Sequence, residues 1–176
     1  MLIFVNFQED NVILSDPAVT NRMWQSWTNT LANTFNNSRR EEGYFITFDT
    51  ATKTYGIDGY LEGPFVPNNT NAFVFLGPTR PPDSITNPTP LDKPVYVVGW
   101  FHTHTPTFYL HWIYLRGVGP TKPHDFNYSA HPFINVPGFV IDYTPANADD
   151  EIPGGHPLDA EATIYTITPP KRRPLP

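Results

Sequence analysis

The 176-residue sequence contains no cysteine. Disulfide bonds, thiolate metal sites and cysteine nucleophiles are therefore excluded, and a bound metal ion would have to be held by histidine, aspartate or glutamate. The lack of thiols also leaves the redox compartment of the protein open.

Basic residues are few. Eleven Lys and Arg stand against 17 Asp and Glu, which gives a formal net charge of −6. The longest basic run, Lys171-Arg172-Arg173, lies close to the C-terminus. Nucleic acid is therefore not expected as a partner, because phosphate binding requires a basic face.

Long hydrophobic runs are missing as well. No apolar stretch approaches the roughly 20 residues of a membrane-spanning helix, so no membrane partner is expected. Residues 1–6 lack the basic region and the small-residue cleavage site of a signal peptide. We expect a soluble chain, either cytoplasmic or, if a leader has been removed, secreted.

The residues that are abundant are typical of one folded domain spanning residues 1–176. Hydrophobic residues make up 39% of the chain and aromatic residues 15%, whereas charged residues reach only 16%. Such a chain can bury a sizeable core. The 21 prolines argue against a helical bundle and favour strands joined by rigid loops.

The apolar pattern predicts an α+β fold, with a mixed, curved sheet and an N-terminal helix packed on it. The helix is expected over residues 17–38, because Asp16 and Pro17 form a start signal. An apolar side chain then recurs at every fourth position: Val19, Met23, Trp27 and Leu31. Strands are expected over residues 43–49, 55–61, 73–76, 95–101, 138–143 and 162–167. Loops are expected over residues 77–94 and 105–124.

The most apolar of these strands runs directly into His102-Thr103-His104. Residues i and i+2 of a strand point to the same side, so both imidazoles can reach one metal ion at about 2.0–2.1 Å. An isolated His-x-His is a weak signal, and two histidines on a polar loop are the alternative. The position at the end of a rigid strand favours a metal site.

A catalytic zinc ion needs a third protein ligand, and two histidines with a carboxylate are a known set. Asp125 is the candidate carboxylate, and the adjacent His124 is its rival. Asp125 could instead be a helix cap or a turn residue.

A general base would complete a hydrolytic site. Glu41 and Glu42 stand between the predicted helix and the first strand, and one of them could point toward the metal. Adjacent strand residues face opposite sides, so we expect the other to be solvated. A solvated acidic pair without a function is the alternative.

In this order of elements and motifs, the chain resembles the JAMM (JAB/MPN-type) metalloproteases of bacterial type. The resemblance spans roughly residues 17–143, which leaves a C-terminal strand and a proline-rich tail in residues 144–176. Residues 40–46 resemble the glutamate opening of the family, residues 99–104 its metal strand, and residues 119–125 its Ser/Thr-to-Asp segment. Residues 135–142 are similar to the strand that follows. Residues 107–118 look like an insertion relative to the family.

The resemblance implies a JAMM/cytidine-deaminase-like fold and a zinc-dependent hydrolase that cleaves a peptide or isopeptide bond in a protein or peptide substrate. The implied zinc ligands are His102, His104 and Asp125. Glu41 is implied as the catalytic base, with Glu42 as the alternative. Thr121 is implied as the oxyanion support, with Ser129 as the alternative.

Two other functions stay open at this point: a catalytically inactive JAMM-like module that binds a partner, and a metal-dependent toxin or effector domain. The substrate and the oligomeric state are not readable from the sequence. The aromatic residues of the insertion either line a substrate cleft or pack over the domain: Phe108, Tyr109, Trp112 and Tyr114.

Overall fold

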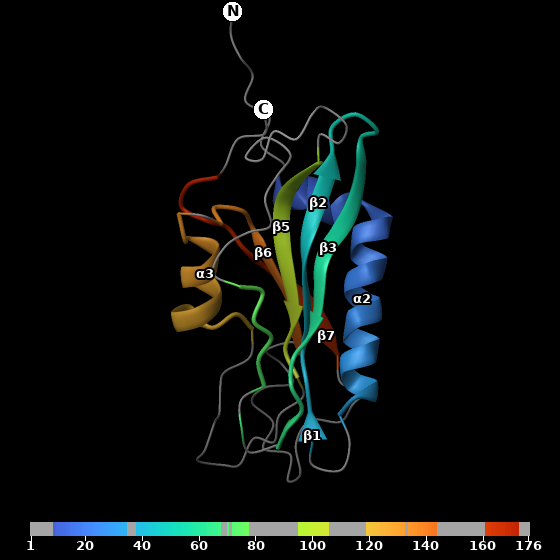
Figure 1. The fold of residues 1–176 in the computed structure, drawn as a ribbon, viewed down its shortest axis with the longest axis vertical. Coiled ribbons are helices and arrows are strands. Elements are labelled where there is room, and N and C mark those ends of the chain that lie inside the picture. The colour runs from blue at the N-terminus through green and yellow to red at the C-terminus, as the bar shows by residue number, and fades with distance from the viewer. Residues whose placement is uncertain are drawn as a thin grey trace, which may run out of the picture.

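The computed structural model describes residues 9–34, 38–67, 70, 72–77, 95–105, 119–132, 134–143 and 161–172, and the statements below concern these residues. The chain forms an α+β structure in which a mixed five-stranded sheet separates two groups of helices. Figure 1 shows helix α2 on one side of this sheet and helix α3 on the other. Among the described helices, none is long and apolar enough to cross a membrane.

The first side is covered by helices α1 (Asp10–Ser15) and α2 (Pro17–Ala32). The Asp16 carboxylate accepts hydrogen bonds from the backbone N–H groups of Ala18 and Val19, which confirms the predicted helix start. The predicted stripe faces the sheet, with Val19, Met23 and Trp27 buried and Leu31 partly buried. Helix α1 was not predicted from the sequence, and its Ile13 is fully buried in the same core.

Helix α2 ends at Ala32, so the prediction of a helix as far as residue 38 is wrong. The side chains of Asn33 and Thr34 donate hydrogen bonds to the backbone carbonyls of Asn29 and Thr30. A further helical turn would have used these two carbonyls as acceptors. Ser38 belongs instead to the short strand β1 (Ser38–Arg39), which pairs with β4 (Val66–Pro67).

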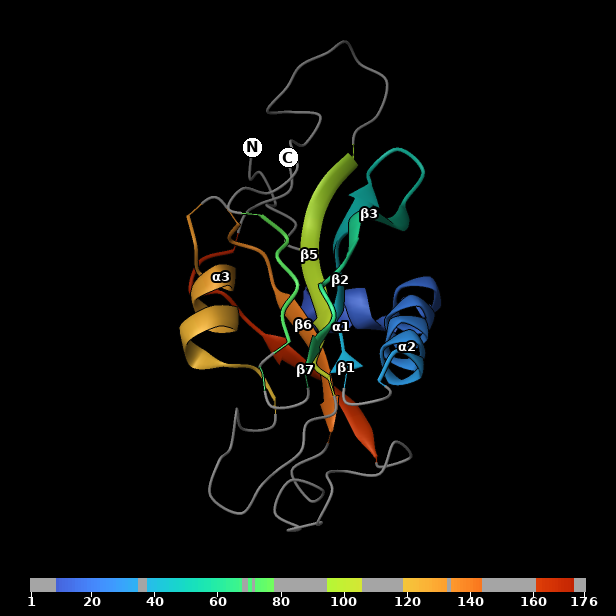
Figure 2. The same ribbon diagram turned by 60° about the horizontal axis from the view of Figure 1, so that its bottom comes forward.

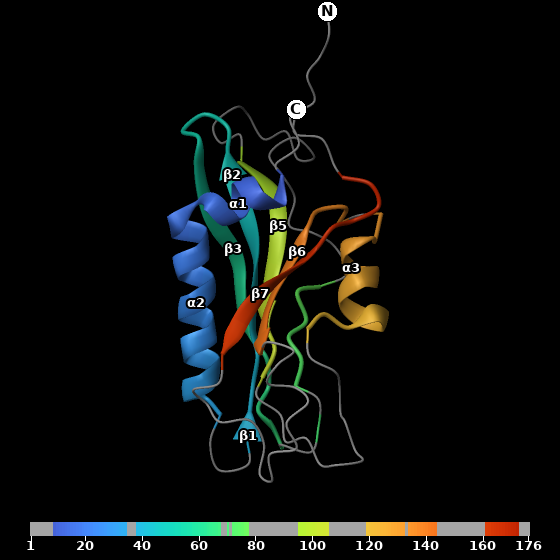
Figure 3. The same cartoon turned by 180° about the vertical axis from the view of Figure 1, so that it is seen from behind.

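The main sheet has the strand order β3-β2-β5-β6-β7. Its strands are β2 (Glu42–Asp49), β3 (Thr54–Glu62), β5 (Val95–Thr103), β6 (Gly138–Tyr143) and β7 (Ala162–Ile167). β5 and β6 are parallel and all other neighbours are antiparallel, so the sheet is mixed, as predicted. Figure 3, the view from behind, shows β7 beside β6 at one edge of the sheet.

An irregularity in β5 decides which face its histidines occupy. Ile46 pairs with Gly99 but Thr47 pairs with Val97, so Val98 is an extra residue on β5. Such a bulge reverses the alternation of side chains along a strand. Before it, Val97 faces away from α2. Beyond the bulge, Trp100 faces away from α2. The alternate positions that follow, His102 and His104, therefore face the same way.

The second side of the sheet carries the π-helical segment η1 (Lys122–Phe126), the short helix α3 (Asn127–Ser129) and residues 72–77 (Figure 2). The prediction of a loop over residues 105–124 is wrong for residues 122–124, which lie in η1. The predicted strand over residues 73–76 is also wrong. This segment crosses the face of the sheet, with the Val74 side chain against Gly43, and does not pair with an edge. Residues 78–94, where another loop was predicted, lie outside the described residues.

Two hydrophobic clusters hold the layers together. One joins α1 and α2 to the sheet, and the other joins the sheet to the segment around α3. The second cluster includes Trp100, whose indole ring lies directly over Gly138, where a Cβ atom would stand 2.1 Å from the ring. Because β7 contributes Ile167 to this cluster, the core extends beyond the range of the family resemblance.

Candidate metal centre

His102 and His104 lie at the C-terminal end of β5 and face the α3 side of the sheet. Their ring centroids are 4.9 Å apart, which confirms that the two imidazoles share one side. His102 also packs edge-on against Trp100, with 5.5 Å between the ring centroids. His104 follows the last residue of β5, but its N–H still donates to the Ile141 carbonyl and so continues the pairing with β6.

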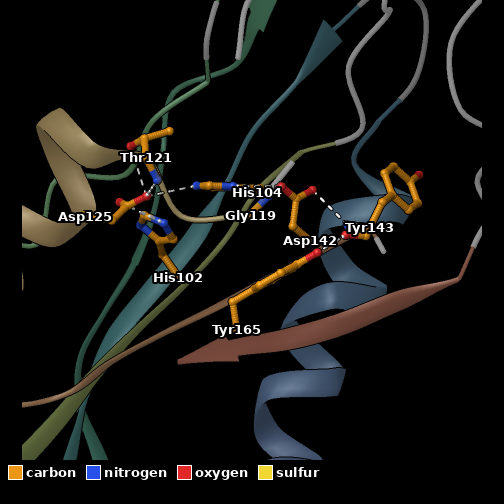
Figure 4. A network of polar contacts seen from close by, with 8 residues as sticks. All are labelled: His102, His104, Gly119, Thr121, Asp125, Asp142, Tyr143 and Tyr165. Carbon is orange, nitrogen blue, oxygen red and sulfur yellow. Dashed lines mark hydrogen bonds and ion pairs between the residues drawn. The ribbon is translucent and has the colours of Figure 1, made fainter. Parts of the chain in front are cut away.

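Asp125 comes to the two histidines from η1. Its carboxylate accepts hydrogen bonds from the N–H of Thr121, at 2.6 Å, and from the Thr121 hydroxyl, at 3.0 Å. The N–H of Asp125 in turn donates to the Thr121 carbonyl. These bonds aim the carboxylate at β5, as Figure 4 shows. His124 is exposed in the same segment and lies outside the group.

The three side chains form a group that could hold a metal ion. His102 Nε2 lies 3.4 Å from Asp125 Oδ1, and His104 Nε2 lies 3.5 Å from Asp125 Oδ2. A tetrahedral ion at about 2.0–2.1 Å from each donor separates two donors by about 3.3 Å, so these distances fit one shared ion. In the described part of the chain this is the one such group of three.

The group is shielded from solvent. The exposed fraction of the side chain is 12% for His102 and 5% for both His104 and Asp125. Burial by itself raises the pKa of the Asp125 carboxyl, but His102, His104 and the Thr121 N–H together hold that pKa well below its ordinary value. The lowered pKa favours the ionised carboxylate, which is the form that binds a cation.

A fourth residue, Asp142 of β6, was missed by the sequence reasoning. Its Oδ2 atom lies 3.0 Å from His104 Nδ1, on the side of the ring opposite Asp125. The sequence did contain a signal: an acidic residue inside an otherwise apolar strand. A buried carboxylate of this kind needs a hydrogen-bonding or charged partner. Which partner it meets depends on the parallel pairing of β5 and β6.

The two glutamates near the site are both buried, with 4% of Glu41 and 1% of Glu42 exposed. The prediction that one of them is solvated is therefore wrong. The segment that carries them is covered on one side by α2, and Glu41 pairs through its carbonyl with the N–H of Gly63. The alternative of a solvated acidic pair fails for the same reason.

The two glutamates differ in the face that they occupy. The Glu42 carboxylate lies 3.4 Å from the side-chain amide of Asn29 in α2, on the face away from the histidines. Gly43 pairs with His102, and alternation along an extended chain places position 41 on the same face as position 43. This geometry favours Glu41 over Glu42 as a group that faces the site.

The candidate oxyanion supports are both engaged in hydrogen bonds. The Thr121 hydroxyl donates to Asp125, so the contact in the structure is one that positions the ligand. Ser129 is fully buried, and its hydroxyl donates to the Val136 carbonyl at 2.8 Å. The proton of Ser129 is thus used within the fold, and the oxyanion role of Thr121 stays a prediction.

The aromatic residues predicted to line a substrate cleft or to pack over the domain, Phe108, Tyr109, Trp112 and Tyr114, lie outside the described residues. Comparison of the chain with protein-family models, curated proteins and solved structures finds no significant match. No comparison thus identifies a JAMM domain, and the family stays a prediction from the sequence motifs.

Proposed function

We propose that this chain is a zinc-dependent hydrolase that cleaves a peptide or isopeptide bond, with His102, His104 and Asp125 as the protein ligands of the metal. The observation that carries the proposal is the convergence of these three side chains from two separate segments. Their donor atoms lie within 4.8 Å of one another in a nearly buried site.

The donor set favours zinc. Two imidazole nitrogens and one carboxylate oxygen are typical of catalytic zinc sites, in which a fourth position stays open for water or substrate. Structural zinc sites usually have four protein ligands and commonly use cysteine, which this chain lacks. Hard ions such as Mg²⁺ prefer oxygen ligands.

A zinc ion held by His102, His104 and Asp125 would supply Lewis acidity, which lowers the pKa of a bound water and polarises a carbonyl. In the proposed reaction the Glu41 carboxylate accepts a proton from the attacking water and passes it to the leaving amine. Thr121 holds Asp125 in position through two hydrogen bonds. To stabilise the oxyanion as well, its hydroxyl would have to turn from Asp125 to the substrate.

The arrangement also supports the proposal of a JAMM-like fold. A glutamate precedes the first long strand, the two histidines end the neighbouring strand, and the aspartate follows after a Thr-to-Asp segment. In the JAMM family this order of site residues accompanies peptide or isopeptide hydrolysis, and that is why we propose this reaction class.

The test combines metal content with cleavage. We expect about one zinc per chain after zinc reconstitution, and cleavage of members of a library of peptides and isopeptide-linked peptides. His102→Ala, His104→Ala and Asp125→Ala should lose both, whereas His124→Ala, the matched control from the same segment, should keep both. A protein that binds zinc but cleaves nothing would support a partner-binding module instead. A protein that binds no zinc would contradict the proposal.

A further inference from the structure

We propose that Asp142 is a positioning residue of the metal centre, which holds the His104 ring so that its Nε2 atom is the nitrogen available to a metal shared with Asp125. The inference rests on the proposed function, because it concerns the same site. It assigns a role to a residue that neither the motifs nor the set of three ligands includes.

The first argument is the set of donors around the Asp142 carboxylate. Asp142 is fully buried. Its Oδ1 atom accepts a hydrogen bond from the N–H of Tyr143 at 2.9 Å, and its Oδ2 atom accepts one from the N–H of Gly119 at 2.8 Å. A carboxylate supplied with backbone N–H donors in this way acts as an acceptor.

The second argument is the tautomer that follows for His104. Because Asp142 Oδ2 accepts at 3.0 Å, His104 Nδ1 must carry the proton that it donates. In the neutral imidazole the other nitrogen, Nε2, then has a lone pair. That nitrogen lies 3.5 Å from Asp125 Oδ2, on the side where a metal would be shared. A carboxylate behind a metal-binding histidine is a recurrent device for fixing ring orientation.

The third argument is that the same carboxylate also holds the segment leading to Asp125. Gly119 begins this segment and adopts a φ of 80°, which favours glycine. A Cβ atom on Gly119 would stand 3.2 Å from the ring of Tyr165, whose hydroxyl donates to the Tyr143 carbonyl at 2.7 Å. Asp142 thus joins β5, β6 and the Gly119 segment at one point, as Figure 4 shows.

The experiment compares Asp142→Asn with a matched control, Asp58→Asn, on the exposed strand β3. Two quantities are measured: the His104 tautomer in the metal-free protein, by ¹⁵N NMR of the imidazole rings, and the dissociation constant for zinc, by competition with a chromophoric chelator. We expect the wild type and the control to hold His104 protonated at Nδ1. In Asp142→Asn the Nε2-protonated form should appear, and the zinc dissociation constant should rise about 10–100-fold.

The proposal is overturned if wild-type His104 carries a proton on Nε2 and none on Nδ1, and this measurement decides the matter even if Asp142→Asn does not fold. It is also overturned if a folded Asp142→Asn variant keeps both the wild-type tautomer and the wild-type zinc affinity. If the wild type binds no zinc, the proposed function fails. A metal-free His104 that is protonated at Nδ1 in the wild type, and not in Asp142→Asn, still supports the positioning role.

Discussion

Glu41 and Glu42 are both buried, but they differ in what their side chains meet. Glu42 lies against Asn29 of α2, and its N–H donates to the Thr103 hydroxyl, which is itself hydrogen-bonded to Thr30. These contacts tie Glu42 to the helix side of the sheet. Two adjacent residues thus have different roles. Glu42 supports packing, and Glu41 is proposed to take part in proton transfer.

The residue-scale prediction follows from this difference. Glu41→Gln keeps the shape of the side chain and removes its basicity, so zinc should stay bound while turnover falls by about 10²–10⁴-fold. Glu42→Gln, the matched control, should retain zinc and turnover. Steady-state kinetics on a cleaved peptide, with metal content measured in parallel, distinguish the two variants. Loss of turnover in Glu42→Gln alone would reverse the assignment, and loss in neither would rule out a glutamate base.

At the scale of elements, one aromatic contact supports the hairpin of β2 and β3, and another lies between β5 and β6. In the hairpin, Tyr55 packs on Phe48 with 4.9 Å between ring centroids. Burial, and then the negative charge of Asp16, raise the pKa of Tyr55 to about 12. Between β5 and β6, the Trp100 ring occupies the space over Gly138, next to His102.

The raised pKa of Tyr55 predicts how stability depends on alkaline pH. The unfolded chain ionises this phenol at a pKa of about 10, below its pKa in the folded protein. The contribution of Tyr55 to stability is therefore complete below about pH 10 and is lost as pH rises toward 12. Urea unfolding of wild type and Tyr55→Phe over this range should show a shallower decline in the variant. Equal slopes would contradict the assignment.

Gly138→Ala tests the contact between β5 and β6. The added methyl group would enter the Trp100 ring, so the ring must shift or the strands must separate, at a cost of about 1–3 kcal/mol in the free energy of unfolding. Because Trp100 packs on His102, zinc affinity should fall as well. Gly56→Ala is the control, since the one nearby atom there is the Thr47 hydroxyl at 3.1 Å. Unchanged urea unfolding of Gly138→Ala would contradict this account of the packing.

At the scale of the whole molecule, the sheet divides a side that packs from a side that carries the site. α1 and α2 close the first side with a continuous apolar stripe, and η1 and α3 lie over the second. The bulge at Val98 connects the two, because without it the alternation along β5 would turn His102 and His104 toward α2.

The features that the sequence predicted correctly are mostly local ones. Four strands of the main sheet follow from apolar runs, and β3 follows from the turn that precedes it. The shared face of His102 and His104 follows from strand alternation. The bulge at Val98, the partner of Asp142 and the burial of Glu42 depend on contacts between segments far apart in the chain. Asp125 was the candidate third ligand, with His124 as its rival, and the structure brings Asp125 to the histidines from η1.

The central claim is that His102, His104 and Asp125 bind one zinc ion, and anomalous diffraction tests it most directly. Crystals grown from zinc-reconstituted protein would be measured at energies just above and just below the zinc absorption edge. The account predicts one strong peak per chain, present only above the edge, about 2.0–2.1 Å from His102 Nε2, from His104 Nε2 and from a carboxylate oxygen of Asp125. A peak at other residues, or no peak at these three, would contradict it.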